Sequence, residues 1–269
     1  MKKLVVFIIF FLNQNLIATE FIGSFYQGNF ILGKTTKETK VFIDNKKIKV
    51  SEEGYFAFGI DRDRKNDVVI KIITKEKTEN ITKKIYKKKY QIQKIDGLPQ
   101  KQVTPPKEVY ERIKNDNKLI SSARAIDSDL TFFSKKFILP VDNPLISGVY
   151  GSQRILNGIP KSPHYGVDFA ADEGTSIKNM LDGVVTLSEK DLYYTGGTVI
   201  IDHGHGISTL YMHMKDVNVL KGQSLKQGDL IGTVGKTGRS TGPHLHIQLH
   251  WYDVKLDPMS VLKLNWEIN

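Results

Sequence analysis

The chain has 269 residues, a formal net charge of +10 at pH 7 and no cysteine. The absence of cysteine excludes disulfides, zinc–thiolate sites and a lipid-modified N-terminal cysteine, so a bound metal would need histidine or carboxylate ligands. A hydrophobic content of 40% is ordinary for a globular fold, and the length suffices for one large domain or two modest ones.

The first 18 residues have the layout of a secretory signal. Lys2 and Lys3 precede an apolar run from Leu4 to Leu12, and Ala18 offers a small residue for cleavage. The apolar run is much shorter than the roughly 20 residues that a helix needs to cross a bilayer. We therefore expect cleavage after Ala18 and an exported protein, periplasmic or associated with the cell envelope, with no transmembrane segment in the mature chain. An uncleaved anchor is the alternative.

Residues 19–96 alternate short apolar runs with turn residues, which predicts a small β-sandwich-like domain. Residues 97–136 are predicted to be a linker, because Gly and Pro punctuate residues 97–99 and 104–106. Within this linker, apolar residues recur at helical spacing over residues 105–125, and we expect one amphipathic helix there. Packing between the domains is its simplest role, and lying across an active-site groove is the alternative.

From residue 137 onward, apolar strands are separated by glycine turns, without a long helical pattern. Candidate core strands cover residues 198–202, 208–212, 229–234 and 245–250. This pattern predicts an antiparallel β domain over residues 137–269. The expected fold class is therefore mainly β, with one connecting helix.

Positive charge is concentrated in the first half of the chain. Residues 140–269 hold 11 Lys and Arg against 13 Asp and Glu, so residues 1–139 carry the whole excess. Five lysines lie between positions 83 and 89. They are typical of an edge strand protected from aggregation, and attraction to an anionic envelope polymer is the alternative. No nucleic-acid recognition motif accompanies them.

Histidines of the second half carry the strongest chemical signal. Side chains two apart in a strand point to the same face, so His244 and His246 present both imidazoles to one side. The same parity would relate His164 and Asp168 if their segment is extended. Two imidazoles and a carboxylate suit zinc with one position left open. These residues, with His213 between the two pairs, indicate a catalytic metal site.

Other metal and phosphate sites do not fit the sequence. There is no His-Glu-x-x-His motif of a helix-borne zinc peptidase. Only 23 residues follow His246, too few for a metal-dependent (β/α) barrel that opens on an HxH motif. A phosphate loop ending at residues 235–237 would need glycine at position 230, where Leu230 stands.

Several segments in the second half together resemble one family. Residues 235–246 (GKTGRSTGPHLH) look like the signature of the lysostaphin/LytM-type peptidoglycan metallopeptidases. Residues 164–168 (HYGVD) resemble that family's H-x-G-x-D segment, and residues 211–214 (YMHM) its Y-x-H-[LM] segment. The resemblance covers roughly residues 137–262 and does not extend to the N-terminal domain.

This resemblance implies that His164, Asp168 and His246 ligate one zinc ion and that His213 and His244 are the two catalytic histidines. No glutamate in these motifs can act as a base, so proton transfer falls to a histidine, which titrates near neutral pH. One histidine would take the proton of water and pass it to the leaving amine, while the other would hydrogen-bond the developing oxyanion. The sequence leaves open which does which.

Two further residues are candidates for substrate binding. Tyr211 shares strand parity with His213 and is expected either to orient it beside the substrate or to lie in the core. Arg154 is expected either to clamp a substrate carboxylate or to serve a structural or surface role.

The remaining histidines are expected to lie outside the chemistry. His203 and His205 flank a turn glycine and are expected to be structural. His250 continues the face of His246, but it lies about 13 Å further along the strand and is expected to be a surface residue.

By this resemblance we expect a secreted, zinc-dependent endopeptidase that hydrolyses peptide crosslinks of bacterial peptidoglycan, with a D,D-type bond favoured. A D,D-carboxypeptidase that trims stem peptides is one alternative. A non-catalytic activator of another wall hydrolase is a second, although all three ligand positions and both catalytic histidines are filled. An envelope-binding adhesin is a third, resting only on the positive charge.

Overall fold

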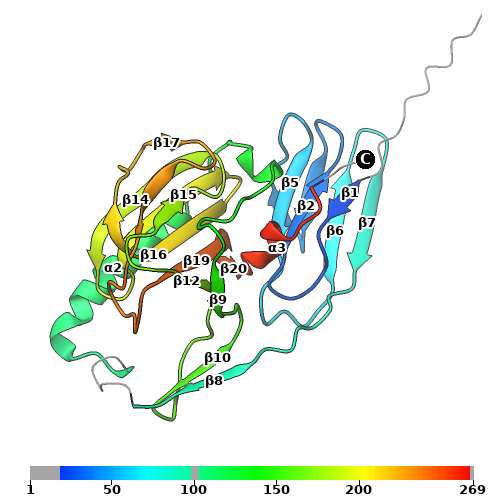
Figure 1. The fold of residues 1–269 in the computed structure, drawn as a ribbon. Helices are drawn as coiled ribbons and strands as arrows, with labels where there is room; N and C mark the ends of the chain where they lie inside the picture. The colour runs from blue at the N-terminus through cyan, green and yellow to red at the C-terminus, as the bar shows by residue number, and fades with distance from the viewer. Residues whose placement is uncertain (1–18, 98–102, 267–269) are drawn as a thin grey trace, which may run out of the picture.

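The computed structural model describes residues 19–97 and 103–266, and the predicted signal over residues 1–18 lies outside them. Within the described ranges, no helix is both long and apolar enough to cross a membrane. Figure 1 shows two lobes, both built mainly of strands. The prediction of a mainly β fold with one main helix is confirmed.

The N-terminal lobe contains two antiparallel sheets. One has the order β1-β2-β5 and the other the order β4-β3-β6-β7. Alternation is clear in β6, where Val68, Ile70 and Ile72 are buried and the residues between them are more exposed. Buried side chains of both sheets belong to one core, which explains why two small sheets are stable together. The strands are β1 (Glu20–Ile22), β2 (Phe30–Lys34), β3 (Lys40–Ile43), β4 (Lys46–Ile48), β5 (Tyr55–Gly59), β6 (Val68–Ile73) and β7 (Thr78–Lys83).

The C-terminal lobe is built on a ten-stranded sheet. Its main path runs β17-β14-β15-β16-β19-β12-β9, β13 pairs with β18, β18 also pairs with β16, and β20 pairs with β19. The strands are β9 (Leu145–Gly148), β12 (Val167–Ala170), β13 (Ser176–Lys178), β14 (Gly183–Leu192), β15 (Gly196–Gly204), β16 (Ile207–Val217), β17 (Ser224–Leu225), β18 (Leu230–Val234), β19 (His244–Trp251) and β20 (Val254–Leu256).

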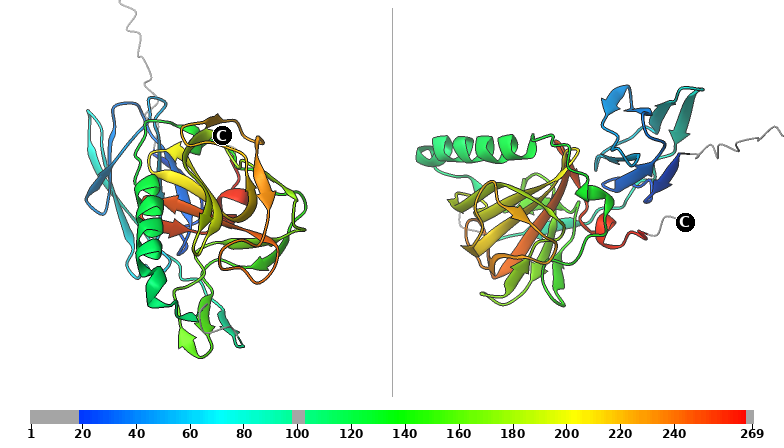
Figure 2. Two further views of the ribbon diagram at one scale, coloured as in Figure 1. Left: turned by 90° about the vertical axis from the view of Figure 1, so that its left-hand side faces the viewer. Right: turned by 90° about the horizontal axis from the view of Figure 1, so that it is seen from above.

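Helix α2 (Tyr110–Arg124) lies across one face of this sheet, as the left view of Figure 2 shows. Its last turn places Ile120 and Ala123 against a small apolar cluster from β14, β15 and β16. Leu210 and Met212 of that cluster stand opposite Gln248 and His246 of β19. Opposed residues of an antiparallel pair share a face, so α2 covers the same face that carries His246. The described residues also include the short helices η1 (Lys107–Val109), η2 (Phe132–Ser134) and α3 (Met259–Leu262).

The two lobes are joined by a shared core and a shared small sheet. Phe58 packs against Trp251 with ring centroids 6.5 Å apart, and Arg62 donates from Nε and Nη2 to the carbonyl oxygen of Gly151 at 3.0 and 2.6 Å. Beyond β7, the chain forms β8 (Ile92–Ile95), which pairs in parallel with β10 (Gln153–Leu156), itself paired with β11 (Ile159–Pro160). β8 pairs with neither N-terminal sheet. The N-terminal half of the chain therefore supplies β8, a neighbouring strand of β10, to the C-terminal lobe.

Candidate metal and catalytic site

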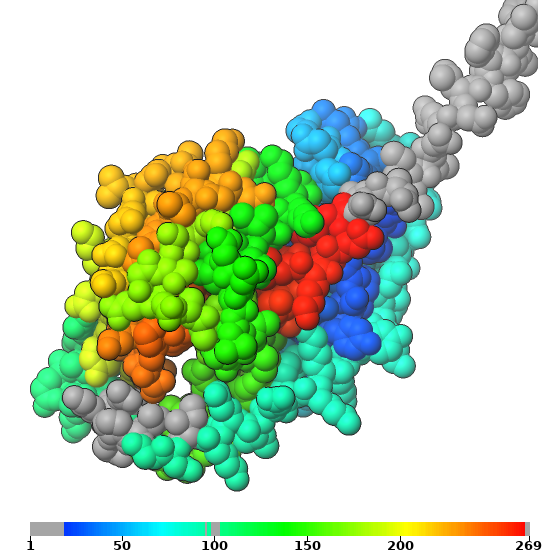
Figure 3. Space-filling view, in the orientation of Figure 1, coloured from blue at the N-terminus to red at the C-terminus, as the bar shows by residue number. Residues whose placement is uncertain are grey.

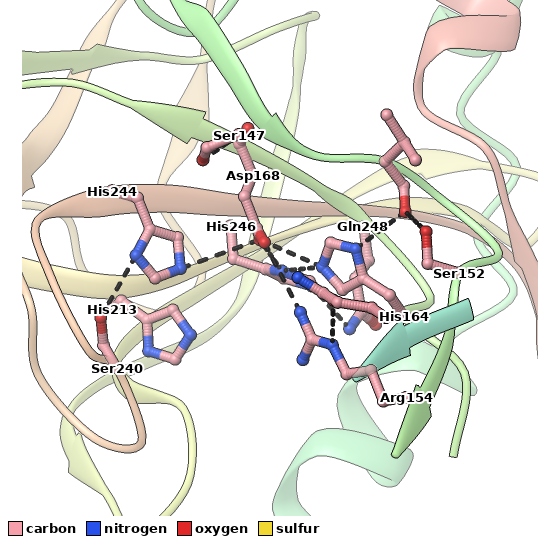
Figure 4. Close-up of polar contacts among 12 residues, drawn as sticks. Ser147, Ser152, Arg154, His164, Asp168, His213, Ser240, His244, His246 and Gln248 are labelled. Atoms are coloured by element: carbon pink, nitrogen blue, oxygen red, sulfur yellow. Dashed lines mark hydrogen bonds and ion pairs between the residues drawn. The ribbon is translucent and has the colours of Figure 1, made fainter. Parts of the chain in front are cut away.

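Pairing of β12 with β19 brings the first residues of the site together. The register places Asp168 opposite His246 and Ala170 opposite His244. Opposed residues share a face, so the Asp168 carboxylate and the imidazoles of His244 and His246 point to the same side, as Figure 4 shows. The strand parity predicted for the two histidines of β19 is present in the structure.

His164 reaches the site from a loop. β12 begins only at Val167, so the expected parity of His164 and Asp168 within one extended segment is wrong. The His164 backbone is held by Ser152 and Gly151, through N–H···O bonds of 2.8 and 2.7 Å. The His164 Nδ1–H donates to the carbonyl oxygen of Val149 at 3.0 Å, which leaves the lone pair on Nε2.

One side-chain atom from each of His164, Asp168 and His246 lies within hydrogen-bond distance of the other two. His164 Nε2 lies 3.1 Å from Asp168 Oδ1 and 3.0 Å from His246 Nδ1, and the two latter atoms are 2.6 Å apart. All three side chains are buried, and together they could hold a metal ion. The donor set of two imidazole nitrogens and one carboxylate oxygen fits zinc, and the bond from His164 to a backbone carbonyl is the usual outer support of a metal ligand.

Electrostatics of this cluster also favour a cation. Burial by itself would raise the pKa of the Asp168 carboxyl, but hydrogen bonds with His164 and His246 and their charges hold it well below its usual value of 3.8. Burial lowers the pKa of His246 from 6.5 to about 4, against the opposing effect of Asp168. At neutral pH the site therefore presents an anionic carboxylate and a neutral His246.

His213 joins the site through an irregularity in β16. The pairing of β15 with β16 shifts between Tyr211 and Met214, so one extra residue stands on β16. At this point His213 has a φ of 64°, a left-handed conformation that costs a non-glycine residue about 1–2 kcal/mol. The His213 N–H is held by the carbonyl oxygen of Thr195 at 2.8 Å. The bulge breaks strand alternation and turns His213 to the face of His246.

Tyr211 consequently does not share a face with His213, and its prediction as a substrate-binding residue is wrong. Its side chain is fully buried. The Met180 N–H donates to the Tyr211 hydroxyl oxygen at 2.9 Å, and the hydroxyl lies 3.5 Å from Asn179 Oδ1. Burial raises the pKa of Tyr211 to about 12. Tyr211 is a core residue that holds the segment before β14.

The two remaining histidines are oriented alike by backbone carbonyls. The His213 Nδ1–H donates to the carbonyl oxygen of Thr237 at 2.9 Å, and the His244 Nδ1–H donates to that of Gly242 at 2.9 Å. A carbonyl oxygen only accepts, so each neutral ring keeps its lone pair on Nε2. The rings lie 4.8 Å apart between centroids, and His244 Nε2 is 3.8 Å from Asp168 Oδ1. Burial, then the charges of His246 and His244, lowers the pKa of His213 to about 3.

Arg154 forms the opposite wall, on β10. Its Nη2 lies 3.6 Å from Asp168 Oδ2, and its Nε donates to Gln93 Oε1 on β8 at 3.3 Å. Figure 4 shows the guanidinium pointing toward Asp168 from the side opposite His244. In Figure 3 a recess separates the orange segment before β19 from the green segment around β10. A guanidinium at such a wall is well placed to meet a carboxylate.

The histidines expected outside the chemistry are all buried. His203 bonds the carbonyl oxygen of Asp182 and Thr209 Oγ1 at 2.7 and 2.8 Å, which gives it a structural role. The expectation that His250 lies at the surface is wrong, because its side chain is 0% exposed beside Arg124 of α2. Strand parity with His246 indicated which face of β19 carries His250, but nothing local in the sequence indicates that α2 covers this face.

Comparisons with known proteins agree with this geometry. Residues 162–258 match the family model described as Peptidase family M23. The peptidoglycan DD-endopeptidase ShyA of Vibrio cholerae serotype O1 is 38% identical over 128 residues, which are 47% of this chain and 29% of ShyA. The DD-carboxypeptidase/endopeptidase Mpg of Neisseria meningitidis serogroup B is 41% identical over 98 residues, which are 36% of this chain and 22% of Mpg. The chain thus spans less than a third of the length of these relatives.

One solved structure resembles most of the chain. A candidate peptidase M23 from Pseudomonas aeruginosa superposes with a TM-score of 0.67 and 25% identity, over 90% of this chain and 96% of that one. Both lobes thus have a counterpart in a known fold. Residues 162–258 form a domain of peptidase family M23, and the predicted resemblance to the lysostaphin/LytM type is confirmed.

Proposed function

We propose that the protein is a zinc-dependent endopeptidase that hydrolyses peptide crosslinks of bacterial peptidoglycan. The observation that carries the proposal is the convergence of His164 Nε2, Asp168 Oδ1 and His246 Nδ1 beside His213 and His244. His164, Asp168 and His246 would hold the zinc ion, which would supply Lewis-acid activation of water and of the scissile carbonyl. The remaining chemistry belongs to the two neighbouring histidines.

Both histidines are prepared for proton transfer. Each is held by a backbone carbonyl through Nδ1–H and keeps a lone pair on Nε2. A neutral imidazole with a bare Nε2 can take a proton from the attacking water and return it to the leaving amine. The protonated or N–H form of the other ring can then donate to the developing oxyanion. Burial lowers the pKa of His213 to about 3, so at neutral pH His213 is a neutral ring with a bare Nε2 that accepts a proton before it can donate one.

The proposed substrate follows from the relatives and from Arg154. ShyA is named a DD-endopeptidase, and we propose a D,D-type bond for this chain as well. A D,D-carboxypeptidase is the second candidate, since Mpg carries both activities in its name and Arg154 stands at the wall of the site. A substrate with a free terminal carboxylate would need such a cation.

The proposal extends to organisation and location. We propose residues 1–18 as an export signal, residues 19–96 and 137–269 as the two domains and residues 97–136 as their linker. The protein would then act in the periplasm or at the cell envelope, where peptidoglycan is its partner. The net positive charge of residues 1–139 would favour contact with anionic envelope polymers.

Mass spectrometry of muropeptides tests this function. Zinc-loaded residues 19–269 are incubated with purified peptidoglycan, and loss of crosslinked dimers with new monomers is the expected result. Shortened stem peptides would identify a carboxypeptidase instead. His244→Ala is the control and is expected to bind zinc with no turnover. No change in the muropeptides with the zinc-loaded wild type would refute the enzymatic proposal and favour an activator.

His246→Ala tests the metal site separately. We expect it to lose both zinc and turnover, because one of three buried ligands is removed. Zinc content measured by atomic emission on the purified variant checks this. Full zinc occupancy in His246→Ala would contradict the ligand assignment.

A further inference from the structure

A row of polar side chains connects the proposed metal ligand His246 to helix α2. Gln248 and His250 follow His246 at two-residue spacing on the same face of β19. His246 Nε2 lies 3.1 Å from Gln248 Nε2, and Gln248 Oε1 lies 2.9 Å from His250 Nε2. His250 Nδ1 lies 3.2 Å from Nη1 of Arg124, the last residue of α2. These four side chains form a continuous chain, which we call the β19 relay.

The two histidines of the relay are buried, whereas Gln248 and Arg124 are partly buried. His250 is 0% exposed and His246 only 5% exposed. Burial, then the charge of Arg124, lowers the pKa of His250 well below 6.5, so His250 is neutral and has one donor and one acceptor nitrogen. Within the described ranges Arg124 Nε is buried with no hydrogen-bond partner. Mismatched polar groups in such a partly enclosed place are not fully relieved by water and cost free energy.

Arg124 sets the direction of the relay from one end. A guanidinium only donates, so His250 Nδ1 must accept and His250 Nε2 must carry the proton. That proton is donated to Gln248 Oε1, which turns the amide nitrogen of Gln248 toward His246. Gln248 therefore offers a donor to His246 Nε2.

His246 sets the opposite direction from the other end. Its Nδ1 faces His164 and Asp168, so it must keep its lone pair there to act as a ligand. A neutral imidazole with a lone pair on Nδ1 carries its proton on Nε2. A donor on His246 then meets a donor on Gln248. Rotating the Gln248 amide by 180° only moves the conflict to the contact between His250 and Arg124.

The conflict arises from the direction in which hydrogen bonds run along the relay. Gln248 and neutral His250 each receive one hydrogen bond and pass one on, so they transmit direction without reversing it. Two donor ends cannot both be satisfied by such a row. Only a residue that accepts on both sides, or an end that stops donating, removes the mismatch.

We propose that Arg124 is a positioning residue that holds Gln248 against the ligand form of His246 and thereby lowers the metal affinity of the site. This inference rests on the proposed role of His246 as a metal ligand. Because coupling between two sites is reciprocal, metal binding also weakens the contact between Arg124 and His250, and so the docking of the α2 end on the sheet. The helix that covers the site face thus tunes the metal centre from outside the ligand shell.

Three substitutions at Arg124 test the proposal on residues 19–269. Arg124→Met keeps an apolar stem but no donor, and Arg124→Gln has an amide oxygen that can accept from His250. Both are expected to bind zinc about tenfold more tightly than wild type, since one unsatisfied hydrogen bond is relieved. Arg124→Lys keeps a donor and is expected to stay near wild type. Zinc affinity is measured by competition with a chromogenic chelator, and Co²⁺ absorption reports whether the ligand geometry is unchanged.

A double-mutant cycle with Gln248→Glu identifies the route. A carboxylate accepts from both His246 and His250, so Arg124 no longer opposes the metal. We expect Arg124→Met to tighten zinc binding in the wild-type background and to have no tightening effect in the Gln248→Glu background. Equal tightening in both backgrounds would refute the relay, as would unchanged or weaker zinc binding by Arg124→Met and Arg124→Gln. If wild type and His246→Ala bound zinc equally, the proposed metal site itself would fail.

Discussion

Gly148 stands where any side chain would strike a proposed metal ligand, which allows a sharp test of the site. Gly148 of β9 is paired with Asp168 of β12. A Cβ on Gly148 would lie 2.2 Å from Asp168 Oδ2 and 2.8 Å from its Cγ. The backbone of Gly148 is not left-handed, so Gly148→Ala adds a clash without backbone strain. The carboxylate must move by about 1 Å to restore an ordinary contact.

The size of the effect follows from this displacement. Moving a reacting or coordinating group by about 1 Å costs on the order of 100-fold, and loss of support to a metal ligand costs roughly 10–100-fold in affinity. We therefore expect Gly148→Ala to weaken zinc binding by about 100-fold, which corresponds to about 2.7 kcal/mol. Turnover at saturating zinc should also fall, because the displaced carboxylate changes the ligand geometry.

Chelator competition and muropeptide turnover are the assays. Gly33→Ala is the matched control, because its Cβ would lie 2.1 Å from the Phe56 ring in the N-terminal lobe, far from the histidines. It is expected to lower the melting temperature and to leave zinc affinity unchanged. A Gly148→Ala protein with wild-type zinc affinity would show that Asp168 is not held where the ligand role requires it.

Three further outcomes are expected. Tyr211→Phe leaves the buried Met180 N–H without its partner and should lower the free energy of unfolding by about 1–3 kcal/mol with zinc affinity unchanged; chemical denaturation checks this, and a selective loss of turnover would restore a substrate role. Arg154→Ala should raise KM for peptides with a free terminal carboxylate more than for crosslinked dimers, and equal effects on both would remove the carboxylate clamp. Burial lowers the pKa of His203 from 6.5 to about 4, so between these pH values the unfolded chain binds a proton that the folded chain does not. The free energy of unfolding should therefore fall by roughly 3 kcal/mol as pH drops through this window, and by less in His203→Asn, measured by denaturation at stepped pH; an unaltered pH slope in that variant would contradict the assignment.

Strand periodicity in the sequence was sufficient to predict that His244 and His246 lie on the same face of one strand. His244 and His246 alternate with buried Leu245, and any regular strand must place both imidazoles on one face. The short apolar runs and glycine turns likewise predicted a mainly β chain, because burial on one side of a strand requires period-two alternation. The helix before the second lobe was also predicted from spacing alone, and α2 ends within one residue of the expected position.

Periodicity failed where pairing with another segment overrides it. Alternation predicted that Tyr211 and His213 share a face, but the bulge in β16 turns His213 to the site and sends Tyr211 into the core. The Thr195 and Thr237 carbonyls that hold His213 lie 18 and 24 residues away in sequence. His164 is similarly placed by loop hydrogen bonds and not by a strand.

The sequence by itself determined the mainly β class and the local spacing that presents His244 and His246 on one face, and it supplied the residues that we propose as ligands and proton-transfer groups. The tertiary structure alone decided which groups are buried and which are coupled. His250 looks like a surface residue until α2 covers its face of the sheet. Arg124 acquires a role only because α2 ends beside His250, which lies 126 residues further along the sequence. Local propensity depends on neighbours along the chain, whereas burial and hydrogen-bond partnership depend on segments that only folding brings into contact.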